Sequence, residues 1–196
     1  DGTVEVVGET AVAASSGTPT VFGGNYVSYI NAAKLSNTKV IVCYMDASNS
    51  QYGTACVLSI SGSTITAGSP VVFHANATAH ISVTALSETK AIVVYHQANN
   101  NGVLSISGST ITAGSAVVFE SANSLYTSVT MLTSTTAIVV YTDTGNSYRG
   151  TACLLTVSGS TVTAGTPMVF RSSNSQWITV ATLSDTKVIV MFRLGN

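Results

Sequence analysis

Short apolar runs alternate with short polar turns along the whole chain, and the alternation repeats. One kind of run reads KVIVCY, KAIVVY, TAIVVY or KVIVMF and ends at Tyr44, Tyr95, Tyr141 or Phe192. An unbroken β-branched run of this length predicts a strand that is covered on both faces. Before each of these runs comes a four-residue turn such as SNTK or SDTK, and before that a run ending in Leu. The four earlier runs predict strands at 30–35, 81–86, 127–132 and 178–183.

A sixteen-residue stretch supplies the other strands of each repeat. Residues 58–73 read LSISGSTITAGSPVVF, and close copies occupy 104–119 and 155–170. Residues 4–22 are a worn fourth copy. Inside the three close copies, Gly62, Gly108 and Gly159 precede Ser between two strand-like runs. Gly at the first of two loop residues predicts a type II′ hairpin, because Gly takes the required positive φ without steric cost.

The period of the repeat predicts the fold. The closing residues Phe22, Phe73, Phe119 and Phe170 are 51, 46 and 51 residues apart, and 48 residues lead from Phe170 round through both ends to Phe22. Four antiparallel strands in a repeat of this length are typical of a β-propeller blade. We therefore predict an all-β, four-bladed β-propeller whose last blade is closed by the N- and C-terminal segments. The single domain covers 1–196, with blades at roughly 23–70, 74–116, 120–167, and 171–196 plus 1–19.

Two alternatives to this fold stay open. The same period allows two chains to exchange halves and form an eight-bladed ring. A parallel β-solenoid also repeats, although its coils are usually shorter and more uniform.

The repeats differ mainly in two kinds of loop, and the predicted topology places both on one face. These are the loops after the KVIVCY-like strands and the connections between blades. Variable loops on a uniform scaffold are the usual carriers of binding. An aromatic ring stands seven residues after each closing Phe, either as a stacking platform for a sugar-like ligand or as a plug of the central channel. These four candidate ligand-binding residues are Tyr29, His80, Tyr126 and Trp177.

Further polar and aromatic residues in the same loops are candidate ligand contacts. Arginines there would clamp a carboxylate or sulfate group through paired N–H donors, unless they are simply solvated. Asp46 and Asp143 occupy matching Asp-x-x-Asn-Ser positions, which favours loop-fixing bonds to the backbone over calcium, since the loops lack further carboxylates. The additional candidates are His74, Glu120, Arg171, Tyr148, Arg149 and Tyr52.

Composition and cysteine usage narrow the function. Only 8% of residues are charged and the net charge is −1, so the chain lacks the basic patch of a nucleic-acid-binding protein. Its apolar runs are of strand length, which argues against membrane insertion. Three cysteines do not form a disulfide framework, although a bridge between Cys43 and Cys56 stays open. A low-charge chain rich in Ser, Thr and Gly is suited to a secreted, extracellular or virion-surface location.

No motif of a metal, cofactor or catalytic site is present, so we predict a protein that is not an enzyme. GxSxG, HExxH and CxxC are all missing from the sequence. A glycosidase would need two carboxylates at a fixed separation. Glu120 with Asp46 or Asp143 is the only such pair that the loops suggest, and the sequence does not fix their distance.

The repeat core, [LV]-S-[IV]-S-G-S-T-[IV]-T-A-G-[ST] followed by an S-x-T-K turn, resembles propeller repeats of bacteriophage, bacterial-surface and secreted lectin-like proteins. Such repeats occur in tail-fibre, virion-surface or lectin-like contexts, so the resemblance implies a type of repeat and not a ligand. The divergent, aromatic- and Asn-rich loops predict a carbohydrate-binding or adhesion module with a glycan or surface protein as partner, and the exchange of halves allows a homo-oligomer. A structural decoration or fibre subunit is the alternative. The sialidase box S-x-D-x-G-x-T-W and the WD40 pattern are missing, so neither activity is implied.

Overall fold

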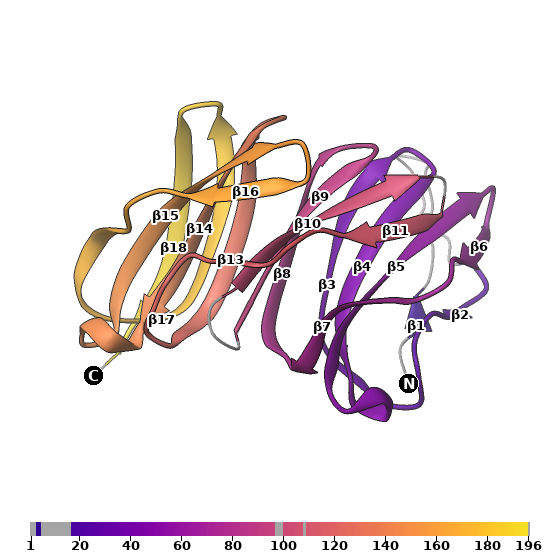
Figure 1. Ribbon diagram of the computed structural model, residues 1–196, viewed down its shortest axis with the longest axis horizontal. Helices are drawn as coiled ribbons and strands as arrows, with labels where there is room; N and C mark the ends of the chain where they lie inside the picture. The colour runs from indigo at the N-terminus through magenta and orange to yellow at the C-terminus, as the bar shows by residue number, and fades with distance from the viewer. Residues whose placement is uncertain (1–2, 5–16, 97–99, 108, 196) are drawn as a thin grey trace.

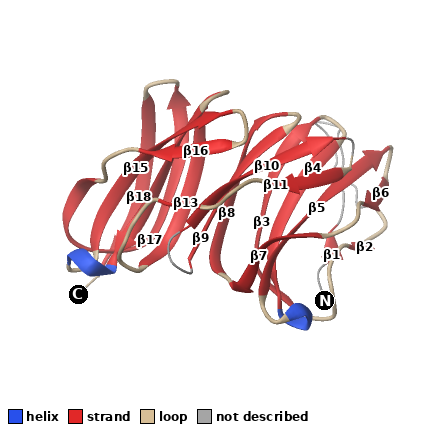
Figure 2. Ribbon diagram, viewed as in Figure 1, coloured by secondary structure: helices blue, strands red, loops and turns tan. Residues whose placement is uncertain are grey.

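The protein is built from antiparallel β-sheets (Figures 1 and 2). The computed structural model describes residues 3–4, 17–96, 100–107 and 109–195. Within them there is no α-helix, and two 3-10 turns, η1 (Ala47–Asn49) and η2 (Thr144–Asn146), are the only helical segments. The all-β prediction is confirmed. Because all the described strand pairs are antiparallel, the parallel β-solenoid is excluded.

The strands fall into three complete units, one half-unit and one short pair. Unit 1 comprises β3 (Val27–Ser36), β4 (Lys39–Asp46), β5 (Tyr52–Ser61), β6 (Thr64–Ala67) and β7 (Val71–Ala77). Unit 2 comprises β8 (Ala79–Ser87), β9 (Lys90–His96), β10 (Asn100–Ser107), β11 (Thr110–Ala113) and β12 (Val117–Val118). Unit 3 comprises β13 (Ser124–Thr133), β14 (Thr136–Asp143), β15 (Arg149–Ser158), β16 (Thr161–Ala164) and the start of β17 (Met168–Ser184). Half-unit 4 is the remainder of β17 with β18 (Lys187–Leu194), and the N-terminal pair is β1 (Thr3–Val4) with β2 (Thr20–Val21).

Each complete unit is a meander whose outermost strand is broken. In unit 1 the order is β3, β4, β5, and β5 then pairs with β6 along its second half and with β7 along its first half. Between the two pieces, the Gly68 N–H donates to the Val57 carbonyl at 2.8 Å. The hairpin between β5 and β6 has Gly62 at φ +59°, and Gly159 has φ +60° in unit 3, as a type II′ turn requires. Gly108 lies outside the described residues.

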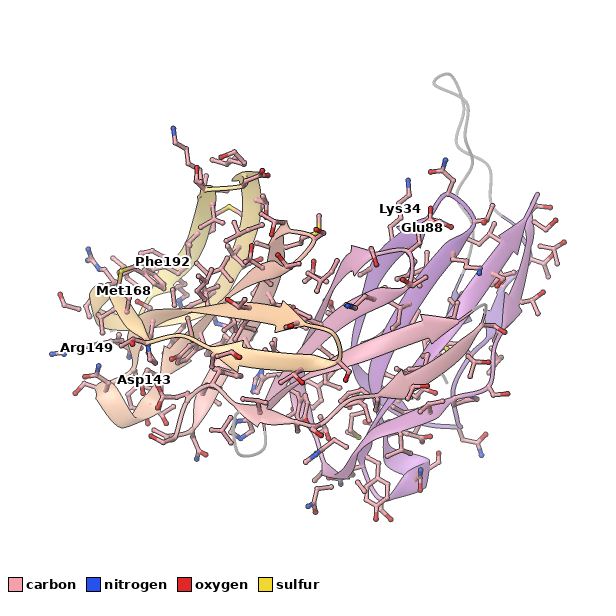
Figure 3. All side chains as sticks on the ribbon, turned by 45° about the horizontal axis from the view of Figure 1, so that its top comes forward. Lys34, Glu88, Asp143, Arg149, Met168 and Phe192 are labelled. Atoms are coloured by element: carbon pink, nitrogen blue, oxygen red, sulfur yellow. The ribbon has the colours of Figure 1, made fainter. Side chains whose placement is uncertain are left out.

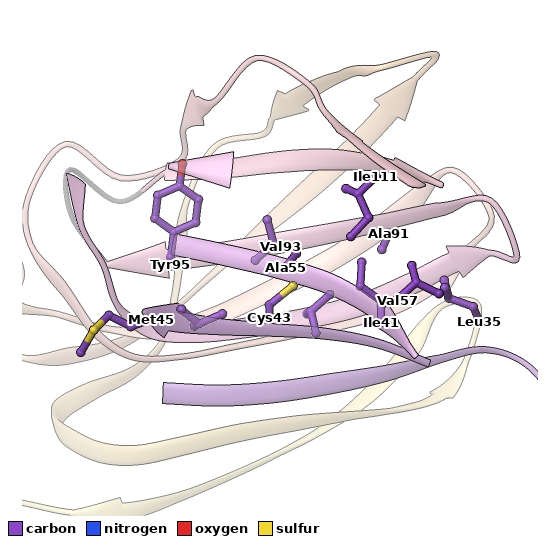
Figure 4. Close-up of a cluster of buried hydrophobic side chains, with 12 residues drawn as sticks. Leu35, Ile41, Cys43, Met45, Ala55, Val57, Ala91, Val93, Tyr95 and Ile111 are labelled. Atoms are coloured by element: carbon purple, nitrogen blue, oxygen red, sulfur yellow. The ribbon is translucent and has the colours of Figure 1, made fainter. Parts of the chain in front are cut away.

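Apolar cores fill the spaces between successive units. Between units 1 and 2, Ile41 and Cys43 from β4 pack with Ala91, Val93 and Tyr95 from β9 (Figure 4). Alternate residues of a strand point to opposite faces, and both faces of β4, β9 and β14 are covered. The predicted two-sided burial of these strands is therefore confirmed. For β18 it is wrong, because no unit lies beyond half-unit 4 in the row (Figure 1).

A repeated aromatic pair joins each unit to the one before it. The closing Phe of one unit packs on the aromatic residue that ends the second strand of the next unit. The ring centroids are 5.4 Å apart for Phe22/Tyr44, 5.3 Å for Phe73/Tyr95, 5.2 Å for Phe119/Tyr141 and 5.8 Å for Phe170/Phe192. Phe22 therefore stands in the place of the closing residue of a unit that precedes unit 1.

A hydrogen bond repeats along the innermost strands in the same way. Asn31 of β3 accepts from the Val83 N–H at 2.9 Å, Ser82 of β8 accepts from the Val129 N–H at 3.1 Å, and Ser128 of β13 accepts from the Val180 N–H at 3.3 Å. The innermost strands β3, β8, β13 and β17 thus stand in a row, each linked to the next. The same hydrogen bond therefore recurs at each of these three steps between units.

The two ends of the chain do not complete a blade with each other, so this part of the prediction is wrong for a single chain. Thr3 and Val4 pair with Val21 and Thr20, whereas β18 pairs only with β17 among the described strands. Figure 1 shows the units in a row, with the two termini at opposite ends. The N-terminal pair stays on unit 1 because Phe22 packs there. Tyr44 also donates its hydroxyl to the Phe22 carbonyl at 3.4 Å.

The structure also answers the question of a cysteine bridge. Cys43, Cys56 and Cys153 are all free and buried. Cys56 lies opposite Val42 in the register of β4 and β5, so Cys43 and Cys56 face opposite sides of the sheet. Burial raises the pKa of the Cys56 thiol to about 11, which keeps this thiol protonated and unreactive at neutral pH.

Candidate binding face

The variable loops gather at one end of the sheets, as the sequence predicted. The pairings Val27↔Asp46, Asp46↔Tyr52 and Tyr52↔Ala77 place the start of β3, the loop after β4 and the exit of β7 at the same end of unit 1. The uniform turns lie at the other end, where Ser36 pairs with Lys39 and Ser61 with Thr64. Figure 2 shows both 3-10 turns at the variable end. We call this end the loop end and the opposite one the turn end.

A β-bulge at the loop end of every innermost strand carries one aromatic residue. The pairing register shifts between Ser28 and Asn31 in β3, and at the equivalent place in β8, β13 and β17. The first of the two residues inside each shift has a left-handed backbone, with φ 52° at Tyr29, 48° at His80, 51° at Tyr126 and 54° at Trp177. A bulge bends the strand and re-aims a side chain. Such φ values are uncommon for bulky residues and mark functional or tightly constrained positions.

These four residues form a continuous file, which we call the aromatic row. The ring centroids are 5.4 Å apart for Tyr29 and His80, 5.6 Å for His80 and Tyr126, and 4.8 Å for Tyr126 and Trp177. Tyr29 is 45% exposed and Trp177 is 62% exposed, and these two form the ends of the row. The four rings lie together at the loop end, but within one chain they make an open row and do not surround the mouth of a channel.

The aromatic row is electrically neutral at physiological pH. Burial lowers the pKa of His80, and the nearby His96, whose ring centroid is 5.9 Å away, lowers it further. The imidazole of His80 is therefore uncharged at pH 7. A neutral row of rings offers its faces to C–H groups rather than charge to an anion.

A pocket opens beside the row, between units 1 and 2. It has a volume of about 280 Å³, and Tyr29 forms one wall. Gln51, Thr78 and His96 contribute polar groups to the lining, and Met45 contributes apolar surface. The Nδ1 atom of His96 is buried and has no hydrogen-bond partner in the described part of the chain. An apolar wall with a few polar groups is the usual composition of a small-molecule site.

His96 is the residue that the sequence interpretation missed. It follows Tyr95 directly, in the position of Met45 in unit 1 and Thr142 in unit 3. A histidine at a position where the other units have Met45 and Thr142 was the one indication in the sequence. Tyr29, Met45 and Gln51 of the pocket come from unit 1, more than 40 residues before His96 along the chain, so no local pattern indicated the site.

Two of the predicted ligand contacts instead partner buried tyrosines. The Tyr141 hydroxyl donates to Glu120 Oε2 at 3.0 Å, and the Ala122 N–H donates to Oε1 at 3.0 Å. In unit 2 the Tyr95 hydroxyl lies 3.4 Å from Nδ1 of His74, and the two rings are in contact. Burial raises the pKa of Tyr95 to about 12, and the pKa of Tyr141 is raised by burial and by Glu120. His74 and Glu120 therefore support the scaffold beneath the loops.

The remaining predicted contacts divide between two units. Arg149 and Arg171 lie on the neighbouring strands β15 and β17 at the loop end of unit 3, where Gly150 pairs with Arg171. Each guanidinium is bonded locally, Arg149 to Asn146 at 3.1 Å and Arg171 to Ser173 at 2.9 Å. Figure 3 shows Arg149 beside Asp143, far from Lys34 and Glu88 of the turn end. Tyr148 is 48% exposed next to this pair, whereas Tyr52 lies on unit 1 beside Asp46.

Only one of the two loop aspartates caps its own turn, because the Asp143 side chain makes no capping bond at η2. The Ser48 N–H donates to Asp46 Oδ1 at 3.0 Å, which confirms the predicted bond from this side chain to the backbone. Asp46 and Asp143 each precede a 3-10 turn, and each turn ends in a left-handed serine, Ser50 or Ser147. Within the described ranges, no three His, Cys, Asp or Glu side chains gather as metal ligands would.

Over the described residues, the fold contains no helix with the length and hydropathy needed to cross a membrane. Comparison with models of protein families and with curated proteins gives no match for this chain.

Proposed function

We propose that the chain is a non-enzymatic carbohydrate-binding module of propeller type, carried on a virion, a cell surface or a secreted assembly. In this proposal the units are propeller blades, and the loop end is the recognition face. The aromatic row is the observation that carries the proposal. Four equivalent rings stand side by side, and each is held by a bulge at a backbone conformation that is unfavourable for its residue type.

A sugar ring suits this surface better than a charged ligand does. Pyranose rings present C–H faces that pack on aromatic side chains, and the neutral row offers such faces. Their hydroxyls need a few donors and acceptors close by, which Gln51, Thr78 and His96 supply in the neighbouring pocket.

A glycan array probed with the whole chain tests the proposal. The best glycan would then be titrated by calorimetry against the wild type, Trp177→Ala and Tyr126→Ala. We expect each substitution to weaken binding about tenfold, because stacking on an aromatic ring contributes on the order of 1 kcal/mol beyond the buried area. Met168→Ala is the matched control, since Met168 is as exposed as Trp177, at 62%, but lies on the outermost strand of unit 3.

The proposal fails if the array shows no bound glycan. It fails equally if Trp177→Ala and Tyr126→Ala bind as tightly as Met168→Ala does. A His96→Ala variant separates the pocket from the row, because it removes a polar contact of the pocket while leaving Tyr126 and Trp177 in place.

A further inference from the structure

The last strand of half-unit 4, β18, is an edge strand, whereas the equivalent strands of the other units are interior strands. β4, β9 and β14 each pair on both sides, with β3 and β5, β8 and β10, and β13 and β15. β18 is their equivalent in sequence and pairs only with β17 among the described strands. A long apolar strand with one unpaired edge is a site of association with another chain.

The side chains of β18 show the same incompleteness. Ile189 is 46% exposed and Met191 is 53% exposed. The equivalent residues of unit 1, Ile41 and Cys43, are both 0% exposed because unit 2 covers them. β18 therefore has the sequence of an interior strand without the neighbours that such a sequence requires.

The N-terminal pair shows the complementary defect. β1 and β2 pair as Thr3↔Val21 and Val4↔Thr20. Counted from the closing Phe, this is the register of β5 with β7 and of β15 with the start of β17. Those equivalent pairings are Thr54↔Val72, Ala55↔Val71, Thr151↔Val169 and Ala152↔Met168. β1 and β2 thus correspond to β5 and β7, the outer strands of a unit. No described strand equivalent to β3 or β4 pairs with them.

The inner strands that β1 and β2 lack are those that half-unit 4 supplies. Phe22, directly after β2, already packs on Tyr44 as the closing Phe of each unit packs on the following unit. One end of the chain therefore carries the outer half of a unit, and the other end carries the inner half. Figure 1 places these halves at opposite ends of the row, so they cannot meet within one chain in this arrangement.

We propose that the protein is a closed dimer in which β1 of a second copy pairs with β18, and β18 of that copy pairs with β1 of the first. In unit 1, Thr54 lies opposite Tyr44 and Ala55 lies opposite Cys43. The equivalent register across the interface is Thr3 opposite Phe192 and Val4 opposite Met191. The first unit of the second copy then covers Ile189 and Met191.

Two copies are the number of chains that would form a closed ring of units. Each chain contributes three complete units and the two halves of a fourth, so two chains give eight units. Propellers usually have about four to eight blades. One chain would give four, which the separated ends exclude, and three would exceed this range. A dimer with two-fold symmetry contains the new interface twice and leaves no strand edge open there. The assembly stands independently of what the loop end binds.

Mass in solution is the first test. Native mass spectrometry of the whole chain should give twice the 20.0 kDa of one copy. Met191→Asp should shift the mass to that of one copy, because it buries a carboxylate in the new interface. Met168→Asp should leave the dimer intact, since Met168 is 62% exposed on the outer strand of unit 3. A wild-type monomer, a ladder of larger species, or a Met191→Asp dimer would each overturn the proposal.

Cross-linking tests the register and does not depend on a disruptive variant. Val4→Cys combined with Met191→Cys should give a covalent dimer after mild oxidation, seen on a non-reducing gel and lost on reduction. Val4→Cys combined with Met168→Cys is the control and should stay monomeric on the gel. A bridge formed within one chain, or no bridge at all, would overturn the proposed register and with it the dimer.

Discussion

The two ends of the sheets use left-handed backbone in opposite ways. At the turn end, positive φ angles in the described residues fall on Gly62 and Gly159, where they carry no steric penalty. At the loop end, they fall on eight residues that are not glycine. These are Tyr29, Ser50, Gln51, His80, Tyr126, Ser147, Tyr148 and Trp177.

This contrast indicates what each end is for. A turn whose only task is to reverse the chain carries the residue that makes reversal easiest. Side chains held in an unfavourable backbone conformation persist where the surrounding structure constrains them, and such positions cluster at binding sites. The turn end is therefore scaffold without backbone strain. The loop end keeps non-glycine side chains in strained backbone conformations, which lowers stability.

The largest expected effect concerns the support beneath the loop end. Glu120→Ala should lower stability by about 2 kcal/mol, because it leaves the buried Tyr141 hydroxyl without its acceptor. Thermal unfolding would show this as a fall of roughly 4–8 °C. At the turn end, the exposed Glu88→Ala should change stability by less than about 0.5 kcal/mol. Equal effects at the two ends would contradict the comparison, and Tyr141→Phe should partly restore stability to Glu120→Ala.

The second effect tests the glycine turns. Gly159→Ala should destabilise by about 1 kcal/mol, since its φ of +60° disfavours any side chain. No atom lies within 4 Å of a Cβ added there, so the loss reflects backbone strain alone. Urea unfolding of Gly159→Ala and of Ser160→Ala, a control in the same turn, would measure it. The interpretation is wrong if the two variants unfold at the same urea concentration.

A third prediction reverses the usual order of alanine and glycine. At position 126, where φ is 51°, Tyr126→Gly should be more stable than Tyr126→Ala by up to about 1 kcal/mol. Met131 lies on the same strand with an ordinary φ, so Met131→Ala should be more stable than Met131→Gly. Chemical denaturation of the four variants would give their free energies of unfolding and so the order of alanine and glycine at each position. Finding the same order at both positions would show that the bulge is not strained.

The smallest effect is a pH dependence confined to the loop end. Burial lowers the pKa of His74 and His80 below the 6.5 of a free imidazole. The unfolded chain then binds more protons than the folded one as pH falls below 6.5, so stability is complete above that pH and declines beneath it. Melting temperatures at pH 7.5 and 5.5 should show a small decrease. The decrease should shrink in His80→Gln, and an unchanged decrease would contradict the assignment to His80.

Much of the fold follows from the sequence because the repeat is local. The apolar runs, the Gly-Ser hairpins and the spacing of the closing Phe residues predict the strands, their antiparallel order and the shared end of the variable loops. The spacing of seven residues from each closing Phe also predicts that Tyr29, His80, Tyr126 and Trp177 lie together. All of these depend on contacts within one repeat or between neighbouring repeats.

What the sequence does not predict depends on longer-range geometry. β14 and β18 have nearly the same pattern, yet one is buried and the other exposed, because burial is decided by which units stand on either side. The left-handed φ at Trp177 and its equivalents has no signal in residue type, since aromatic residues rarely adopt it. His96 became visible as a pocket residue only when two units were placed side by side.

The hydrogen bond that Asn31, Ser82 and Ser128 each accept from the following innermost strand links every unit to the next by an identical step. An array joined in this way is modular. Duplication of the gene segment that encodes one unit would give a longer chain in which the added unit contacts its neighbours through the same hydrogen bond. Selection on copy number would then act on the length of the row, and each duplicated unit would bring another bulge with its own aromatic residue.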